Sequence, residues 1–204
     1  MVGLREALRS SPAAFLIVSP TGRTSPDNIP LRGYAGPSGR LDVVARAFEA
    51  VVEDKALAVA VLLGPPEPPV TVVADSGCRA RLGGERGFIQ WYLKALTGGS
   101  GCPQVFRGVG LRDVLSLASR SHRIVYLREG GVDVMEGKAL ETVCSKALFV
   151  LGSHLDIPPG EERVVRSYSD LEVSLGPVSY HTEHAVAFIE AIRLSSACSR
   201  ETDI

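Results

Sequence analysis

The sequence predicts an α/β fold with a mostly parallel sheet and helices on both faces. Two observations lead to this prediction. Short continuous apolar runs alternate with amphipathic patterns along the 204 residues, and several runs stop at a glycine or a proline-rich turn. Continuous apolar runs of about four to eight residues are typical of strands buried on both faces, as in parallel sheets. Alternation of such strands with helical patterns indicates strand–helix–strand units.

The N-terminal half supplies two strands and a helix. Ala13–Ser19 and Leu57–Leu63 are apolar throughout except for the terminal serine and are expected as buried strands. Pro20–Ser38 is a long connection rich in Pro, Gly, Ser and Thr, and connections of this length are usually functional or disordered. A helix is expected from Gly39, because apolar residues recur at helical spacing. That stripe comprises Leu41, Val44, Ala45, Phe48 and Val52.

The remaining elements follow from the same two periodicities. Strands are expected at Val70–Ala74, Cys78–Leu82, His122–Arg128, Lys146–Leu151 and Asp170–Leu175. Helices are expected at Glu85–Leu96, Leu111–Ser119, Pro159–Arg166 and Thr182–Leu194. In the first of these helices the inward-facing residues are expected to be Phe88, Trp91, Tyr92 and Leu96, and in the last Ala185, Phe188, Ile189 and Ile192.

Composition is that of one globular domain spanning residues 1–204, with 45% hydrophobic and 22% charged residues and a net charge of −1. No apolar run approaches the roughly 20 residues of a membrane span. Residues 1–12 carry charges and lack the apolar centre of a signal peptide, so we expect a cytoplasmic protein. The four cysteines form no CxxC pair, and His181 and His184 have no third ligand near them, so no metal site is expected.

The common nucleotide and hydrolase motifs are absent. No GxGxxG follows the first strand, no glycine-rich loop precedes a Lys-Ser/Thr pair, and GxSxG does not occur. What remains is a pair of strands near the C-terminus that end at Gly152 and Gly176, each followed by proline and a helical pattern. Glycine lets backbone amides approach a flat ligand closely. His154, between them, is expected to be a turn residue rather than a general base.

Five segments, in order, resemble the archaeal tRNA pseudouridine-54 N1-methyltransferases of the SPOUT superfamily. They are "GPSGRLDVVARAF" (36–48), "LLGPPEPPVTV" (62–72), "IVYLREGG" (124–131), "LFVLGSHLDIPPGEE" (148–162) and "VSLGPVSYHTEHAVAFI" (173–189). The resemblance extends from about Ala14 to Ile192, so residues 1–12 are expected to be an N-terminal extension. This sequence departs from the family's pattern at three positions. The family often has Asp and Gly where this chain has Ser153 and Asp156, and a cysteine near the position of Ala185.

The resemblance implies a C-terminal trefoil knot, S-adenosyl-L-methionine as cofactor, tRNA as substrate and a homodimer. The implied cofactor-binding residues are Leu127, Gly152, Ser174, Leu175, Gly176, Pro177, Val178 and Ser179. Arg40 and Arg32, in or beside the long loop, are expected to contact RNA phosphate. Asp42 matches the acidic residue of the family's "GRLD" segment and is the candidate catalytic group, although an ion pair with Arg46 at i+4 would explain it equally well.

Alternative functions stay open on the sequence alone. The related rRNA pseudouridine N1-methyltransferases have the same chemistry on another RNA. A non-catalytic RNA-binding or assembly protein could keep the fold without the cofactor, and an α/β enzyme could bind another nucleotide. Binding of S-adenosylhomocysteine separates the first two interpretations from the last two, and methylation of defined transcripts separates tRNA from rRNA.

Overall fold

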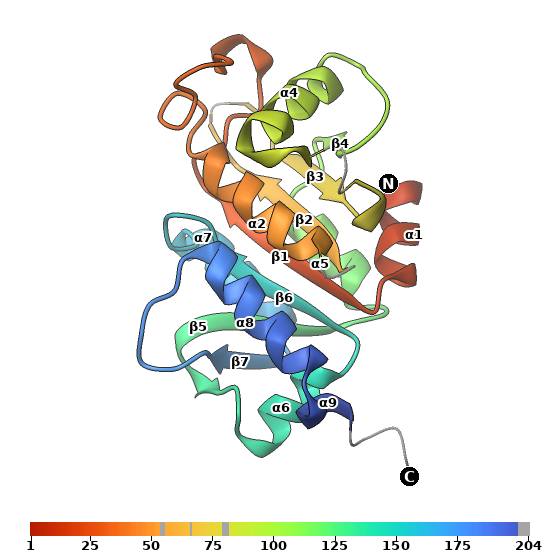
Figure 1. Cartoon of the computed structure of the whole chain (residues 1–204), viewed down its shortest axis with the longest axis vertical. Coiled ribbons are helices and arrows are strands. Elements are labelled where there is room, and N and C mark those ends of the chain that lie inside the picture. Colours follow the sequence, from red (N-terminus) through yellow and green to blue (C-terminus); the bar gives the residue numbers. More distant parts are fainter. Residues whose placement is uncertain (54–55, 66, 79–81, 200–204) are drawn as a thin grey trace.

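The computed structural model describes residues 1–53, 56–65, 67–78 and 82–199. Its centre is a seven-stranded sheet with strand order β4-β3-β2-β1-β6-β5-β7 (Figure 1). The strands are β1 Ala13–Ser19, β2 Leu57–Leu62, β3 Val70–Ala74, β4 Gln104–Arg107, β5 Arg123–Asp133, β6 Ala147–Gly152 and β7 Leu171–Ser174. The prediction of an α/β fold is confirmed.

Parallel pairing dominates the sheet. β1 pairs in parallel with β2 and β6, and β5 pairs in parallel with β6 and β7. At one edge of the sheet, β3 pairs antiparallel with β2, and β4 pairs antiparallel with β3. The five parallel strands β2, β1, β6, β5 and β7 therefore end at the same edge of the sheet, which is where α/β proteins bind ligands.

One face of the sheet is covered by α2 (Leu41–Glu53), α4 (Gly84–Leu96), α6 (Gly137–Cys144), α8 (Thr182–Leu194) and the short α9 (Ser196–Ser199). Their apolar side chains form one hydrophobic cluster with alternate residues of β1, among them Phe15 and Ile17. Phe15 and Phe149 on the neighbouring strands lie with ring centroids 5.0 Å apart. The aromatic pair fixes β1 beside β6 in the centre of the sheet.

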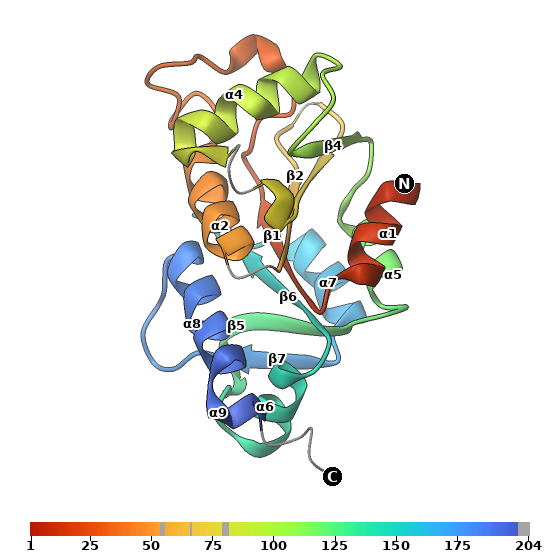
Figure 2. The same cartoon turned by 45° about the vertical axis from the view of Figure 1, so that its right-hand side comes forward.

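The opposite face is covered by α1 (Val2–Ser10), α5 (Leu111–Ala118) and α7 (Pro159–Tyr168), as Figure 2 shows. These helices and the other residues of β1 form a second cluster. Residues 1–12 contribute to it, because Leu4 and Leu8 are buried and the His122 imidazole is hydrogen-bonded to the Ser11 carbonyl. Among the described residues, no helix has the length and apolar character needed to cross a bilayer.

Most predicted elements are confirmed, and the differences have physical causes. α2 begins at Leu41 rather than Gly39, because Gly39 and Arg40 both have positive φ. Cys78 lies in a 3₁₀ turn (Ser76–Cys78) instead of a strand, and residues 79–81 lie outside the described residues. In α4 the buried position belongs to Ile89, whereas Trp91 is half-buried beneath Lys94.

Other elements were not predicted at all. β4 is four residues long and pairs only at the sheet edge, so it has no buried apolar run. α1, α6 and α9 are nine, eight and four residues long. Helices this short carry little periodic signal, and their stability comes mainly from packing against the rest of the chain.

The C-terminal helix reaches its place by passing across the strand ends. From β7 at the sheet edge, residues 175–181 return past the tips of β5 and β6 before α8 packs on α2 (Figure 1). At the start of α8 the Thr182 hydroxyl lies within hydrogen-bond distance of the Gly152 and Ser153 carbonyl oxygens, at 3.1 and 2.8 Å. A trefoil knot needs such a return path; the threading itself stays a prediction.

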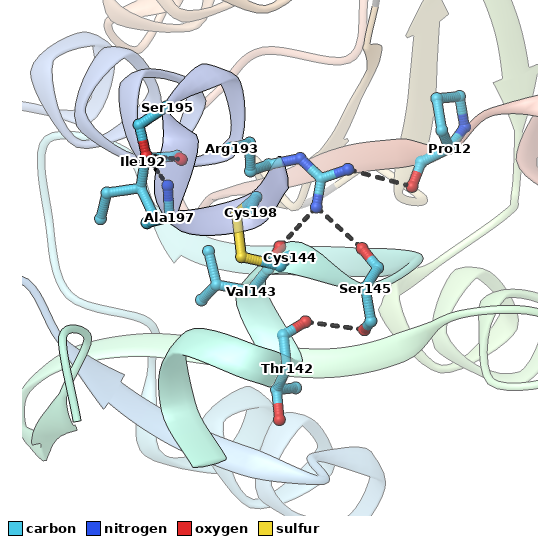
Figure 3. The surroundings of a disulfide bond; sticks show 10 residues. All are labelled: Pro12, Thr142, Val143, Cys144, Ser145, Ile192, Arg193, Ser195, Ala197 and Cys198. Atoms are coloured by element: carbon cyan, nitrogen blue, oxygen red, sulfur yellow. Dashed lines mark hydrogen bonds between the residues drawn. A yellow bond between two sulfur atoms is a disulfide. The ribbon is translucent and has the colours of Figure 1, made fainter. Parts of the chain in front are cut away.

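Two disulfides join cysteines that are far apart in the sequence. Cys78 pairs with Cys102, and Cys144 pairs with Cys198, which ties α9 to the end of α6 (Figure 3). Beside the second disulfide the Arg193 guanidinium donates to the Val143 and Ser145 carbonyl oxygens, the latter at 2.8 Å. The pairing was not predicted, because separations of 24 and 54 residues give no local motif. Disulfides favour oxidising compartments, with the intracellular proteins of hyperthermophiles as an exception.

Candidate active site

A cleft of about 990 Å³ lies at the carboxyl edge of the parallel strands. Its walls are the ends of β5, β6 and β7 with the segments that follow them, the first turn of α8, and Arg40 beside α2. Of the eight residues predicted to bind cofactor, seven line it: Leu127, Gly152, Ser174, Leu175, Gly176, Val178 and Ser179. Pro177 lies between two lining residues and is not itself among them.

The first wall is the irregular part of β5. Leu127 pairs with Val173, and the next pair is Val132 with the same residue, so residues 128–131 form a bulge. At Gly131 an added Cβ would lie within 2.7 Å of the β7 backbone, so only glycine permits this crossing. The bulge directs residues 128 and 129 into the cleft, where both are lining residues.

A polar network holds this wall in place. The Tyr126 hydroxyl donates to Glu162 of α7 at 3.4 Å, and Arg128 forms an ion pair with Glu172 at 2.9 Å. Arg166 pairs with both carboxylates. Burial and then the charge of Glu162 raise the pKa of Tyr126 to about 12, so its phenol keeps its proton at neutral pH.

The second wall is the turn after β6. A Cβ on Gly152 would lie 2.7 Å from the Leu155 carbonyl oxygen, so this glycine is required by the turn itself. The Ser153 amide donates to the Val18 carbonyl of β1 at 3.0 Å, which extends the sheet by one bond. Together with the contacts of Thr182, these bonds fix the turn against the start of α8.

The third wall is the segment after β7, and here glycine has a different explanation. Gly176 has φ +119°, a conformation that side-chain-bearing residues rarely adopt, and no heavy atom lies within 4 Å of a Cβ built there. The buried Ser174 hydroxyl accepts from the Gly176 amide at 3.2 Å and so shapes the bend. The protein leaves open space beside Gly176, which is itself one of the residues that line the cleft.

Opposite these walls, the base of the long loop places Arg40 at the edge of the cleft. The Arg23 amide donates to Ser38 O at 3.0 Å, and Thr21 Oγ1 donates to Gly39 O at 2.9 Å. Arg40 is the only non-glycine residue with positive φ in the described part of the chain, at +65°. Such a conformation costs about 1 kcal/mol or more, and strained residues concentrate at functional sites.

Asp42 is enclosed by arginines. Arg40 Nε donates to Oδ1 at 3.0 Å, Arg40 Nη2 donates to Oδ2 at 2.9 Å, and Arg46 Nη1 reaches Oδ2 at 3.4 Å. Burial alone would raise the pKa of this carboxyl, but the hydrogen bonds and charges of the two arginines outweigh it and hold the pKa below its ordinary value. A buried carboxylate with these partners is a weak proton acceptor.

Arg46 connects three helices at the same point. Its guanidinium contacts Asp42 on α2, Glu85 on α4 at 2.6 Å and Glu183 on α8 at 3.0 Å. The predicted i, i+4 pair with Asp42 is therefore present, as one contact of a network. Through Glu183, which lines the cleft, the network fixes the first turn of α8 against α2.

The other two arginines of the loop lie elsewhere. Arg32 and Arg23 have exposed side chains and are not among the residues that line the cleft. The backbone carbonyl of Arg23 accepts from the Tyr92 hydroxyl at 2.8 Å, which anchors the loop on α4. In the described ranges, no three His, Cys, Asp or Glu residues are arranged to hold a metal ion.

With this geometry in place, the chain can be compared with known proteins. Residues 13–197 match the family model described as putative SAM-dependent RNA methyltransferase. The tRNA (pseudouridine(54)-N(1))-methyltransferase of Aeropyrum pernix is 41% identical over 182 residues, which cover 88% of this chain and 93% of the relative. The chain belongs to the tRNA (pseudouridine(54)-N(1))-methyltransferase family.

Two further matches agree with this membership. The pseudouridine-54 methyltransferase of Methanopyrus kandleri is 30% identical, with 86% of this chain and 89% of the relative covered. The solved structure of Archaeoglobus fulgidus Nep1 bound to S-adenosylhomocysteine has a TM-score of 0.62 at 17% identity, covering 89% of this chain and 97% of that one. At that identity the likeness supports the SPOUT-like fold alone.

Several residues that line the cleft were not predicted from the sequence. Arg46, Tyr126, Glu162 and His154 all line the cleft. Arg46 was considered only as a partner for Asp42, and His154 was expected to be a turn residue rather than a general base. Ser153 and Asp156, where the sequence departs from the family pattern, also line the cleft.

Proposed function

We propose that the protein is an S-adenosylmethionine-dependent methyltransferase that methylates N1 of pseudouridine at position 54 of tRNA. Membership of the family supports this proposal. The observation that carries it in the structure is a cleft formed by three strand-end segments, open beside Gly176 and facing a strained arginine. Such a role places the protein in the cytoplasm, with tRNA.

The residues present fit the cofactor. Residues 151–153, 174–176, 178 and 179 line the cleft, and their backbone groups would hydrogen-bond the edge of an adenine. The space left at Gly176 permits a ligand to approach the backbone. When bound, S-adenosylmethionine supplies a methyl group on a positively charged sulfur. The chain's own residues then have to orient the nucleobase, exclude water and take up one proton.

The experiment has two stages. Calorimetry with S-adenosylhomocysteine tests the cofactor, and lack of binding would favour a non-catalytic RNA-binding protein or another nucleotide enzyme. Methyl transfer is then measured on tRNA transcripts with pseudouridine or uridine at position 54, beside an rRNA fragment containing pseudouridine. We expect methylation of the pseudouridine tRNA only. Preferential methylation of the rRNA fragment would instead indicate that the protein has the function of the related rRNA pseudouridine methyltransferases.

Arg40 is proposed to bind phosphate of the tRNA, since Asp42 leaves one face of its guanidinium to the cleft. Arg40→Ala is expected to weaken tRNA binding and to lower the slope of log Kd against log salt by about one. Arg120→Ala, an exposed arginine after α5 at the other end of the strands, is the matched control and should leave the slope unchanged. An unchanged slope in Arg40→Ala would limit this residue to a structural role. Arg32 stays a weaker proposal of the same kind.

We also propose a homodimer that packs on the outer side of α8. Ala185, Ile189 and Ile192 are buried in the chain's own core, so they are not available to a partner. The outer stripe of α8 is apolar and exposed at Ala187, Ala191 and Leu194. Light scattering should give twice the chain mass of 21.7 kDa, and Ala191→Arg should shift it toward the monomer. A monomer of the parent protein at micromolar concentration contradicts the proposal.

A further inference from the structure

His154 occupies a position in the cleft that the turn does not require. It follows the cofactor-side turn at Gly152, and its half-buried ring lines the cleft. The charges of Arg40, which is proposed to bind RNA, and of Asp42 act on its imidazole. The imidazole therefore shares the cleft with the residues proposed for the cofactor and with Arg40, which is proposed for the RNA.

The hydrogen bonds of the imidazole determine which nitrogen carries the proton. Nε2 lies 3.4 Å from Thr21 Oγ1, and Nδ1 lies 3.3 Å from Ser153 Oγ. The Thr21 hydroxyl has a single hydrogen, which it donates to the Gly39 carbonyl at 2.9 Å. Its oxygen can therefore only accept from Nε2–H. The neutral ring then has its basic lone pair on Nδ1.

We propose that His154 is the catalytic residue that accepts the N1 proton of pseudouridine, through Nδ1. This inference rests on the proposed function. The nitrogen lone pair of N1 forms the new bond to the methyl carbon, the carbon–sulfur bond breaks with its electron pair going to sulfur, and the N1 proton passes to Nδ1. The Ser153 hydroxyl occupies that lone pair in the free protein and is displaced by the nucleobase. The imidazolium later releases its proton to water.

The electrostatic surroundings agree with this role. Burial and then the charge of Arg40 lower the pKa of His154, against a smaller opposite effect of Asp42. The ring is therefore neutral, and able to accept a proton, at neutral pH. The other arginine, carboxylate and histidine residues that line the same cleft are Arg46, Arg128, Glu129, Asp156, Glu162, His181 and Glu183. Asp42, with its arginine partners, is the weaker acceptor of the two candidates.

The test uses His154→Gln and His154→Ala, with His184→Gln on the exposed side of α8 as control. Under single-turnover conditions the two His154 variants should lose about 10²-fold or more in rate, while the Kd values for S-adenosylhomocysteine and tRNA stay within a few-fold. Added imidazole should partly restore His154→Ala. The parent rate should rise with pH through the lowered histidine pKa and then level off, and this rise should be absent in His154→Gln.

A second measurement needs no turnover. Nitrogen-15 NMR of the free protein should show His154 as the Nε2–H tautomer; a ring protonated on Nδ1 instead overturns the proposal. So does a His154→Gln rate within a few-fold of the parent, or a slow His154→Ala that imidazole does not accelerate. Failure of the proposed function is distinguished by the methyl-transfer assay on the parent protein. A parent protein that binds S-adenosylhomocysteine but methylates no pseudouridine contradicts that function.

Discussion

Replacing Gly176 with valine is expected to weaken S-adenosylhomocysteine binding by about 100-fold or more while the protein remains folded. A 100-fold loss corresponds to about 2.7 kcal/mol. The Cβ would enter the open space of the cleft, and valine does not tolerate φ +119° without moving the backbone. Both effects displace the backbone amides and carbonyls that we propose for the adenine edge.

A second glycine with positive φ provides a control that separates the loss of ligand binding from general destabilisation. Gly98, after α4, has φ +91° and also has no heavy atom within 4 Å of a Cβ placed on it, but it lies away from the cleft. Gly98→Val should lower the melting temperature to a similar extent and leave the ligand Kd unchanged. If Gly176→Val binds the ligand as tightly as the parent in calorimetry, the segment after β7 is not the cofactor site.

The glycines of the two strand ends show what the sequence could predict. Gly152 and Gly176 both follow apolar runs, and both line the cleft. The sequence could not separate their roles, because the distinction depends on how the backbone folds around each one. Gly152 is required by the Leu155 carbonyl within its own turn, whereas Gly176 faces open space. The same sequence pattern thus corresponds to a glycine enclosed by its own turn and to a glycine beside open space.

The contacts of Asp42 could be predicted from the sequence only in part. The i, i+4 rule predicted the contact with Arg46, because both residues lie on one helix. The stronger contact with Arg40 depends on a left-handed backbone at a non-glycine residue, which no sequence rule predicts. The contact between His154 and Thr21 was likewise not predicted, since Thr21 lies more than a hundred residues earlier in the chain.

The last prediction concerns Asp42→Asn, which keeps the shape of the side chain and removes its charge. We expect turnover to fall by about 10²-fold or more, as for a misplaced functional group. Asparagine cannot accept from both arginines as a carboxylate does, so Arg40 loses its charged anchor and Arg46 loses one of its three acidic partners. Loss of these bonds should also lower the free energy of unfolding by about 1–3 kcal/mol.

A double-mutant cycle with Arg40→Ala distinguishes positioning from acid–base catalysis. If Asp42 acts by holding Arg40, its charge removal weakens tRNA binding, and the losses in Asp42→Asn and Arg40→Ala are strongly non-additive in the double variant. The acid side of the pH profile, assigned above to His154, then persists in Asp42→Asn. The opposite result has three parts: tRNA binding is unchanged, the two losses are additive, and the pH dependence disappears. In that case Asp42 is the general base. The two arginines bound to its carboxylate, and the lowered pKa that they impose, favour the first outcome.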